Sequence, residues 1–298
     1  MAARVIDGKE VARAKRAEIK ARVEALAARS VVPGLAVILV GEDPASVSYV
    51  TGKEKASAEL GIASLGRRLP ASASEAELLA LVRAYDADPA VHGILVQLPL
   101  PPHIDERRII SAISPEKDVD GLTAANVGRM LLEEPCFVPC TPAGVLELIR
   151  SAGVETRGAR AVVLGRSNLV GRPLVNLLSR KSYNATVTAC HTGTLDLPAI
   201  CREADILIAC AGRPGLVRGD WIKAGACVID VGVTRVEDPG AKAGFRLKGD
   251  VDFEAAAAVA GWITPVPGGV GPMTITMLLD NATAAAERAS GILPGSGA

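Results

Sequence analysis

Three polar residues, Tyr49, Lys53 and Gln97, have types and spacing that could support catalysis. Tyr49 and Lys53 are four residues apart, so they share one face if this segment is helical. Gln97 directly follows the strand predicted at 91–96 (VHGILV). It lies beside Tyr49 and Lys53 if both elements end at the carboxyl edge of a parallel sheet, where ligands bind. A lysine in such a place can serve as an acid or base. The alternative is a solvated helical lysine and a half-buried tyrosine.

Two loops offer further ligand-binding groups. Residues 115–121 (PEKDVDG) set opposite charges close together, which indicates either a solvated turn or a carboxylate that binds the N–H groups of a heterocycle. Residues 264–274 (TPVPGGVGPMT) combine many glycines and prolines immediately before an apolar helix. That composition favours a rigid wall against which a flat ligand packs.

A glycine turn of the dinucleotide-binding type lies at Gly165–Gly171 (GRSNLVG), after the apolar residues 161–164. Glycine lets the backbone approach a pyrophosphate, and the following helix start supplies free N–H groups. The turn departs from G-x-G-x-x-G, because Ser167 replaces the second glycine and one extra residue precedes Gly171. A glycine-rich turn without a ligand is therefore the alternative.

The end of the next strand indicates which dinucleotide binds. An NAD site usually places an acidic residue there for the ribose 2′-hydroxyl. Here the strand ends in Cys190-His191-Thr192, with no carboxylate before Asp196. Arg166, His191 and the nearby hydroxyls would favour a 2′-phosphate. The sequence predicts NADP over NAD, although His191 alone is equally compatible with a plain loop histidine.

The elements that must position these residues alternate between strand and helix. The first set comprises a strand at 35–40, a helix from Asp43-Pro44 to Gly61, a helix with a capping box at Ser74 and Glu77, and a strand at 91–96. The second comprises a helix at 141–153, strands at 161–164, 185–190, 204–210 and 226–231, a helix at 170–178 and a last helix at 272–289. This order predicts an α/β protein with two parallel sheets flanked by helices and right-handed crossovers.

Composition excludes several classes of protein. The chain has 298 residues, 33 basic and 33 acidic, with 49% hydrophobic and 3% aromatic residues. Zero net charge and few aromatic residues argue against nucleic-acid binding. Six scattered cysteines and three histidines indicate reduced thiols and no metal site. No apolar stretch is long enough to span a membrane. From these features together we expect a cytoplasmic protein that binds neither nucleic acid nor membrane.

Together these motifs resemble the bifunctional methylenetetrahydrofolate dehydrogenase/methenyltetrahydrofolate cyclohydrolase family. The resemblance covers nearly all of residues 3–289 and follows the family's order. It depends on five motifs: YVTGK at 49–53, VQLPLP at 96–101, PEKDVDG at 115–121, GRSNLVG at 165–171 and PVPGGVGPMT at 265–274.

The resemblance implies a two-domain enzyme with a cleft between the domains. Residues 1–139 would form the catalytic, folate-binding domain, completed by the C-terminal helix in 270–298, and residues 140–269 would form a Rossmann-like NADP-binding domain. Two such chains would form a homodimer through their cofactor domains. The family acts on tetrahydrofolate one-carbon derivatives.

The resemblance also implies roles for individual residues. Lys53 would be the catalytic lysine, Tyr49 would stack on or orient the pterin-like ring, Gln97 would tune Lys53, and Asp120 would hydrogen-bond the heterocycle. Thr192 stands where many members have serine. Expected substrate contacts are Tyr49, Val96, Leu98, Pro99, Asp120, Pro267, Gly268, Gly271 and Pro272; expected cofactor contacts are Gly165, Arg166, Ser167, Val170, Gly171, His191, Thr192, Gly212, Val233 and Thr274.

The activity implied is oxidation of 5,10-methylenetetrahydrofolate with NADP⁺, followed by hydrolysis of the methenyl product to 10-formyltetrahydrofolate. One alternative is a monofunctional dehydrogenase, against which the complete set of Tyr49, Lys53, Gln97 and Asp120 argues. Another is a non-catalytic NADP-binding sensor, which would leave the first-domain motifs unexplained.

Overall fold

The computed structural model describes residues 2–241 and 244–292. The chain divides into two compact units: unit 1 is Met1–Arg13 with Thr141–Thr274, and unit 2 is Ala14–Cys140 with Ile275–Ala298. The last six residues of the C-terminal segment expected at 270–298 lie outside the described residues. Both units are built on parallel sheets flanked by helices, which confirms the predicted fold class.

Unit 2 is organised around strand β2 (Gly34–Val40), which is buried at all seven positions. It pairs in parallel with β3 (Ala63–Ser64) and β4 (Arg67–Leu69), and also with β5 (Gly93–Val96). Its alternate side chains enter two different cores, as expected for a strand covered on both faces. Leu35, Val37 and Leu39 belong to one core and Ala36, Ile38 and Val40 to the other.

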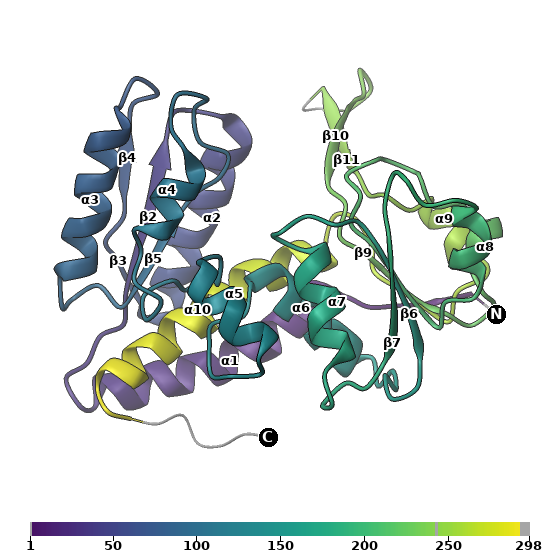
Figure 1. The fold of residues 1–298 in the computed structure, drawn as a ribbon, viewed down its shortest axis with the longest axis horizontal. Helices are drawn as coiled ribbons and strands as arrows, with labels where there is room; N and C mark the ends of the chain where they lie inside the picture. Colours follow the sequence, from purple (N-terminus) through teal and green to yellow (C-terminus); the bar gives the residue numbers. More distant parts are fainter. Residues whose placement is uncertain (1, 242–243, 293–298) are drawn as a thin grey trace. The chain divides into compact units, whose positions relative to one another are not determined.

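Helices close both faces of this sheet (Figure 1). The first core includes residues of α1 (Gly8–Ala27), α2 (Pro44–Leu60) and α10 (Val270–Ala289). The second includes residues of α3 (Glu75–Ala87) and α4 (Glu106–Ser111). Helix α5 (Ala124–Leu131) comes next after α4 in the chain. Burial of apolar side chains on both faces is what fixes the sheet that carries Gln97.

Local sequence signals set the ends of the helices in unit 2. The Asp43 carboxylate accepts a hydrogen bond from Ser46 N at 2.8 Å, Pro44 begins α2, and Gly61 ends it in the left-handed conformation. Ser74 and Glu77 form the predicted capping box of α3. These contacts satisfy backbone groups that a helix end leaves unpaired. The contacts at Asp43 and Gly61 fix where α2, the helix that carries Lys53, begins and ends.

Unit 1 contains a six-stranded parallel sheet in the order β1-β12-β9-β8-β6-β7. Its strands are β1 (Arg4–Val5), β6 (Arg160–Leu164), β7 (Thr186–Cys190), β8 (Ile206–Ala209), β9 (Cys227–Asp230) and β12 (Trp262–Ile263). Its helices are α6 (Cys140–Ser151), α7 (Gly171–Ser179), α8 (Leu197–Arg202), α9 (Phe253–Ala257) and a 3-10 turn at Gly219–Trp221. Strand order reverses at β6, which has β7 on one side and β8 on the other, so ligand binding is expected at its carboxyl end.

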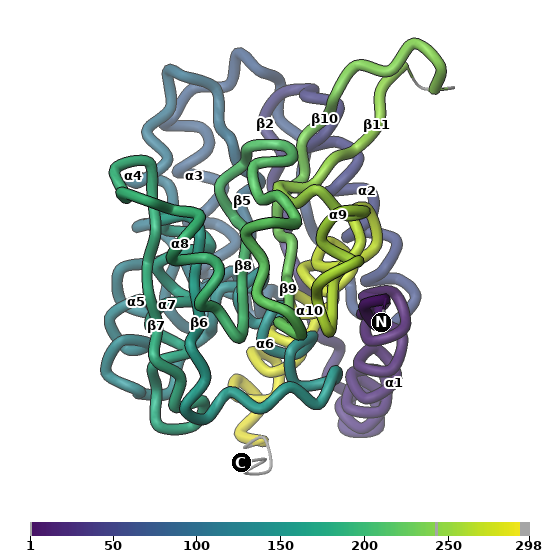
Figure 2. Tube along the Cα trace, turned by 90° about the vertical axis from the view of Figure 1, so that its right-hand side faces the viewer, coloured from purple at the N-terminus to yellow at the C-terminus, as the bar shows by residue number. Residues whose placement is uncertain are grey.

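An antiparallel hairpin of β10 (Thr234–Glu237) and β11 (Phe245–Lys248) extends from this sheet (Figure 2). We did not predict this hairpin from the sequence. Its residues alternate between half-buried and exposed, a weak pattern without an apolar run.

The N-terminal segment lies in unit 1, whereas the family resemblance implied a single domain for residues 1–139. The physical reason is a long-range strand pair: Arg4 is opposite Trp262 and Val5 opposite Ile263. Gly8 then packs so closely on the Gly269 carbonyl that a Cβ atom built there would be 1.7 Å from the oxygen. Residues 270–274, which we expected with the folate-binding domain, also belong to unit 1.

The cysteines are free thiols, as the sequence predicted. Four of the six are buried and Cys136 and Cys210 are half-buried. Among the described residues, no helix combines the length and the apolar character that crossing a bilayer requires.

Arg22 links two helices of unit 2, and its loss is expected to destabilise the protein. Its guanidinium on α1 binds Glu287 on α10, with Nη2–Oε2 at 2.7 Å and Nε–Oε1 at 2.9 Å, and also contacts Asp280. Glu287 is only 6% exposed, so Arg22→Met leaves a buried carboxylate uncompensated. We expect the free energy of unfolding to fall by about 2–3 kcal/mol. This loss is smaller than that for breaking a fully buried ion pair, because Arg22 is partly exposed.

Arg13→Met is the matched control, because Arg13 lies on the same helix in an exposed pair with Glu10 at 3.3 Å. It should change stability by less than about 0.5 kcal/mol. Calorimetric melting of both variants makes the comparison. Equal midpoints would contradict a stabilising role for the Arg22 cluster.

Candidate active site

Lys53 is a buried lysine bound to Gln97. Its side chain lies on α2 and the residue is 7% exposed. Its Nζ donates to Gln97 Oε1 at 2.9 Å, and Gln97 Nε2 donates to Leu98 O at 2.8 Å. The second bond fixes the glutamine amide so that its oxygen faces the lysine. The structure thus brings together two residues that the sequence predicted to meet, from α2 and from the end of β5.

The surroundings of Lys53 favour its neutral form. Burial lowers the pKa of the Lys53 amine, and the charge of Asp120 opposes this only in part. Burial likewise raises the pKa of Asp120, against the opposing charge of Lys53. Both shifts follow from the cost of placing a charge away from water. Both shifts bring the pKa values of the amine and the carboxyl group closer together, which suits proton transfer.

The two aspartates of the loop at 115–121 have different environments. Asp118 is 1% exposed and accepts hydrogen bonds from Leu122 N, Thr123 N and Asn126 Nδ2 at 2.8–3.1 Å. Those bonds hold the loop and the start of α5. Asp120 is half-buried, and its electrostatic partners are Lys53, Cys140 and Asp118. Asp120 is therefore the carboxyl group of this loop that is placed beside the lysine.

Two residues near Lys53 were not identified from the sequence. Cys140 is buried; its Sγ donates to Val119 O at 3.4 Å, and burial and Asp120 raise the pKa of its thiol. Asn281 on α10 donates from Nδ2 to Val119 O at 2.9 Å and to Val138 O at 3.1 Å. No local pattern marks either residue, because each reaches the site only through the tertiary fold. Both support the backbone next to Asp120.

The other expected substrate contacts of unit 2 surround this group. Tyr49 lies one turn before Lys53 on α2 and is 41% exposed. Val96 is buried at the end of β5, Leu98 is half-buried, and Pro99 is exposed after a cis peptide bond. Their role in substrate binding stays a prediction.

In unit 1 the glycine turn lies at the carboxyl end of β6. Gly165 has φ of +143°, and a Cβ atom there would lie 2.4 Å from Cys210 O. A Cβ atom at Gly171 would lie 2.2 Å from Gly165 O. Ser167 Oγ accepts from Val170 N at 3.2 Å and from Gly171 N at 3.4 Å. The turn is thus a tight backbone cradle at a helix start, which fits a dinucleotide pyrophosphate.

The remaining residues expected at the cofactor follow the ends of neighbouring strands. Gly165 N donates to Cys190 O at 2.9 Å, so the end of β7 lies beside the turn. Arg166, His191 and Thr192 are all exposed, and His191 Nδ1 accepts from Gly193 N at 3.0 Å. Gly212 and Val233 follow β8 and β9, and Thr274 Oγ1 lies 3.0 Å from Thr141 Oγ1. Accessible basic and hydroxyl groups near the turn are compatible with a 2′-phosphate.

The segment expected to form a wall against a flat ligand belongs to unit 1. Thr264 is buried, Pro267 follows a cis peptide bond, and Gly268 has a positive φ. Gly271 and Pro272 are half-buried in the first turn of α10. Their contact with substrate stays a prediction.

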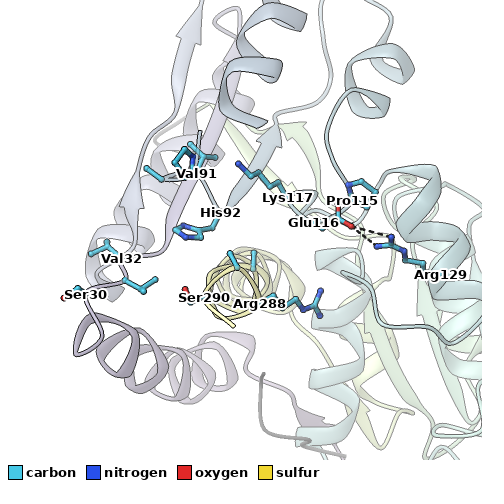
Figure 3. A pocket seen from close by; sticks show the side chains of 15 residues that line it. Ser30, Val32, Val91, His92, Pro115, Glu116, Lys117, Arg129, Arg288 and Ser290 are labelled. Atoms are coloured by element: carbon cyan, nitrogen blue, oxygen red, sulfur yellow. Dashed lines mark hydrogen bonds and ion pairs between the residues drawn. The ribbon is translucent and has the colours of Figure 1, made fainter. Parts of the chain in front are cut away.

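Unit 2 also contains an open pocket of about 640 Å³ (Figure 3). Val32 and His92, which line it, precede β2 and β5, whereas Gln97 follows β5. The pocket therefore lies at the amino edge of the sheet, away from Lys53. Its Lys117 ammonium is bound to Tyr85 O and Asp88 O. Because its lining contains none of the predicted site residues, we assign the chemistry to the Lys53 site.

Two family profiles and several known proteins match this chain. The profile of the tetrahydrofolate dehydrogenase/cyclohydrolase catalytic domain matches residues 6–120, and that of the corresponding NAD(P)-binding domain matches residues 139–290. The bifunctional protein FolD of Moorella thermoacetica is 56% identical over 288 residues, which are 97% of this chain and 100% of that protein. The FolD of Acidiphilium cryptum is 58% identical over 286 residues, 96% of this chain and 99% of that protein.

A solved structure gives the same result. Trypanosoma brucei N5,N10-methylenetetrahydrofolate dehydrogenase-cyclohydrolase, complexed with NADP cofactor and inhibitor, matches with a TM-score of 0.93 and 46% identity over 97% of this chain and 99% of that one. The resemblance found in the sequence motifs is thereby confirmed, and the chain belongs to the tetrahydrofolate dehydrogenase/cyclohydrolase family.

Proposed function

We propose that this chain oxidises 5,10-methylenetetrahydrofolate with NADP⁺ and then hydrolyses the methenyl product to 10-formyltetrahydrofolate. The observation that carries the proposal is the buried contact of Lys53 with Gln97, next to Asp120. A dehydrogenase alone needs substrate alignment, whereas hydrolysis also needs a group that accepts and returns a proton. The relatives named FolD are described as bifunctional.

In the oxidation, bound NADP⁺ would accept the hydride. The residues of the chain bind and orient the substrate and the cofactor. Tyr49 packs on the pterin-like ring, and Asp120 hydrogen-bonds its N–H groups. In unit 1, the backbone of Gly165–Gly171 receives the pyrophosphate and Arg166 the 2′-phosphate.

In the hydrolysis, Lys53 moves the proton. Water attacks the methenyl carbon while the neutral Lys53 amine accepts a proton from it. The ammonium then returns this proton to N5 as the C–N5 bond breaks. The hydroxyl group on the carbon loses its proton to solvent as it becomes the carbonyl, which leaves the formyl group on N10. The cationic methenyl compound favours the neutral amine further, since like charges repel. Gln97, held by Leu98 O, keeps the amine pointed in one direction in both protonation states.

We expect Arg166→Ala to weaken NADP⁺ binding about tenfold or more and to leave NAD⁺ binding nearly unchanged. A charge-assisted bond to the 2′-phosphate is lost only with NADP⁺. Arg160→Ala is the control, because Arg160 is an exposed arginine at the start of β6, paired with Glu203. Titration of both cofactors measures the effect. Equal losses for NADP⁺ and NAD⁺ would contradict a 2′-phosphate contact.

The oxidation is tested by incubating purified protein with 5,10-methylenetetrahydrofolate and either NADP⁺ or NAD⁺. We expect formation of reduced cofactor with a clear preference for NADP⁺. No reduction of either cofactor would overturn the proposed function and favour a non-catalytic NADP-binding sensor. A preference for NAD⁺ would overturn the cofactor assignment alone.

We further propose a homodimer through the cofactor domains and a place in the cytoplasm, with no nucleic acid or membrane as partner. The free thiols support the cytoplasm. The zero net charge supports the absence of nucleic acid and membrane as partners. Light scattering should give twice the chain mass of 30.7 kDa. A mass of one chain would contradict the dimer.

A further inference from the structure

Two buried aspartates lie beneath the carboxyl edge of the sheet in unit 1. Asp230 ends β9 and is 3% exposed, and Asp250, shortly after β11, is fully buried. Neither was singled out from the sequence, and neither takes part in the reactions proposed above. Buried carboxylates are costly unless they accept hydrogen bonds, so their bonding partners indicate what they hold in place.

Asp250 holds the turn that follows β8. Its Oδ2 accepts hydrogen bonds from Ala211 N at 2.6 Å and from Gly212 N at 2.9 Å. Gly212 has φ of +67°, and a Cβ atom built there would meet nothing in the described part of the chain within 4 Å. The turn is accessible at Gly212, so water could satisfy its amides without help from the protein. Instead, the buried Asp250 carboxylate binds these amides from the protein interior. It thereby fixes the conformation of the turn and leaves its outer surface accessible.

Asp230 in turn holds Asp250. Its Oδ1 accepts from Asp250 N at 2.9 Å and from Gly232 N at 3.0 Å, and its Oδ2 accepts from Val251 N at 2.9 Å. Burial raises the pKa of Asp230 to about 6, with the charge of Asp250 adding to the shift. Asp250 Oδ1 has no hydrogen-bond partner among the described residues and lies against Gly232, where a Cβ atom would be 2.3 Å away. The pair therefore joins the ends of β8 and β9.

The segments that follow β8 and β9 both contain residues expected to contact the cofactor. Cys210, immediately before the turn, places its carbonyl oxygen and Sγ against Gly165, at 2.4 and 2.8 Å from a built Cβ atom. Gly232 precedes Val233, which is 45% exposed. A shift of Asp250 would thus move the backbone that packs on the glycine turn as well as the loop that carries Val233.

We propose that Asp250 is a positioning residue for NADP binding, which holds the Ala211–Gly212 turn in its binding conformation and is itself held by Asp230. The inference depends on the proposed cofactor site. It predicts that the turn is already ordered before the cofactor binds, and that the acceptor oxygen of residue 250 matters more than its charge.

Three variants separate these effects. Asp250→Ser removes the acceptor from reach of the turn, and we expect the dissociation constant for NADP⁺, measured by calorimetric titration, to rise about tenfold or more. Asp250→Asn keeps one oxygen that can accept from both amides, and it should bind within about threefold of wild type. Asp252→Asn makes the same charge change two residues away at the N-cap of α9, where asparagine is an equivalent cap, and should have no effect. Hydrolysis of the methenyl compound, which needs no cofactor, should be unchanged in all three.

Wild-type affinity in Asp250→Ser, or an equal loss in Asp250→Asn, would overturn the inference. Parallel losses of hydrolysis and NADP⁺ binding in Asp250→Ser would also overturn it, since they indicate a purely structural role. If Asp250→Ser does not fold, amide hydrogen exchange of wild-type protein provides the test. Slow exchange at Ala211 and Gly212 without cofactor supports the inference, and fast exchange overturns it. Wild-type protein that fails to bind NADP⁺ would instead refute the proposed cofactor site.

Discussion

A Lys53→Met variant is expected to lose at least about 100-fold, and up to about 10⁴-fold, of the hydrolysis rate, the range attributed to positioned general acid–base groups. Methionine keeps the length and apolar stem of the buried side chain but can neither accept nor return a proton. Removal of a buried amine whose pKa is already lowered by burial should not destabilise the fold. Loss of methenyl absorbance with the methenyl compound supplied alone measures the rate.

Lys55→Met provides the matched control. Lys55 is an exposed lysine on the same helix, so its replacement makes the same chemical change away from Gln97. It should hydrolyse the methenyl compound at the wild-type rate. Circular dichroism and NADP⁺ titration establish that both variants are folded. Hydrolysis retained in Lys53→Met would refute the role assigned to this residue.

A Gly165→Ala variant is expected to need a much higher NADP⁺ concentration for the oxidation, while it retains the hydrolysis. The positive φ of Gly165 and the 2.4 Å approach of a Cβ atom to Cys210 O mean that any side chain strains the backbone and displaces the turn. Strain of this kind costs about 1–3 kcal/mol, which corresponds to roughly a 5- to 150-fold weaker binding of NADP⁺. The Lys53 group lies in the other unit, so hydrolysis should stay near the wild-type rate.

Gly158→Ala tests whether a positive φ alone explains the effect. Gly158 has φ of +74° and precedes β6 at its opposite end, and no atom of the described residues lies within 4 Å of a built Cβ atom. It should lose some stability but bind NADP⁺ normally. Comparison of the Michaelis constants for NADP⁺ in the two variants makes the test. A similar rise in both, or none in Gly165→Ala, would contradict a pyrophosphate cradle at this turn.

Much of the fold followed from local sequence. The uninterrupted apolar run of β2, the Asp43-Pro44 start of α2 and the Ser74–Glu77 capping box all occur where they were predicted. Each is determined by residues close together in the chain, so its signal is present before the chain folds. The same holds for the turn at Gly165–Gly171, which follows a strand and precedes a helix.

Features that depend on distant residues could not be predicted in this way. The pairing of Arg4 with Trp262 places the first residues in unit 1, and two-residue strands have no detectable pattern. Asn281 and Cys140 bind the backbone next to Asp120 from positions that are distant in the sequence. The sequence motif also contains two similar aspartates, and only the hydrogen bonds of Asp118 separate its structural role from that of Asp120. The functional assignments of the individual site residues stay predictions.

The most direct test of the proposed two-step function is the decay of 5,10-methenyltetrahydrofolate supplied alone to the wild-type protein, without NADP. We predict a decay much faster than in buffer, with 10-formyltetrahydrofolate as the product, because the Lys53 site needs no cofactor. A decay at the buffer rate, in a protein that still reduces NADP⁺ with the methylene compound, would contradict the two-step function. The chain would then be a monofunctional dehydrogenase, and the proton-transfer role of Lys53 would be wrong.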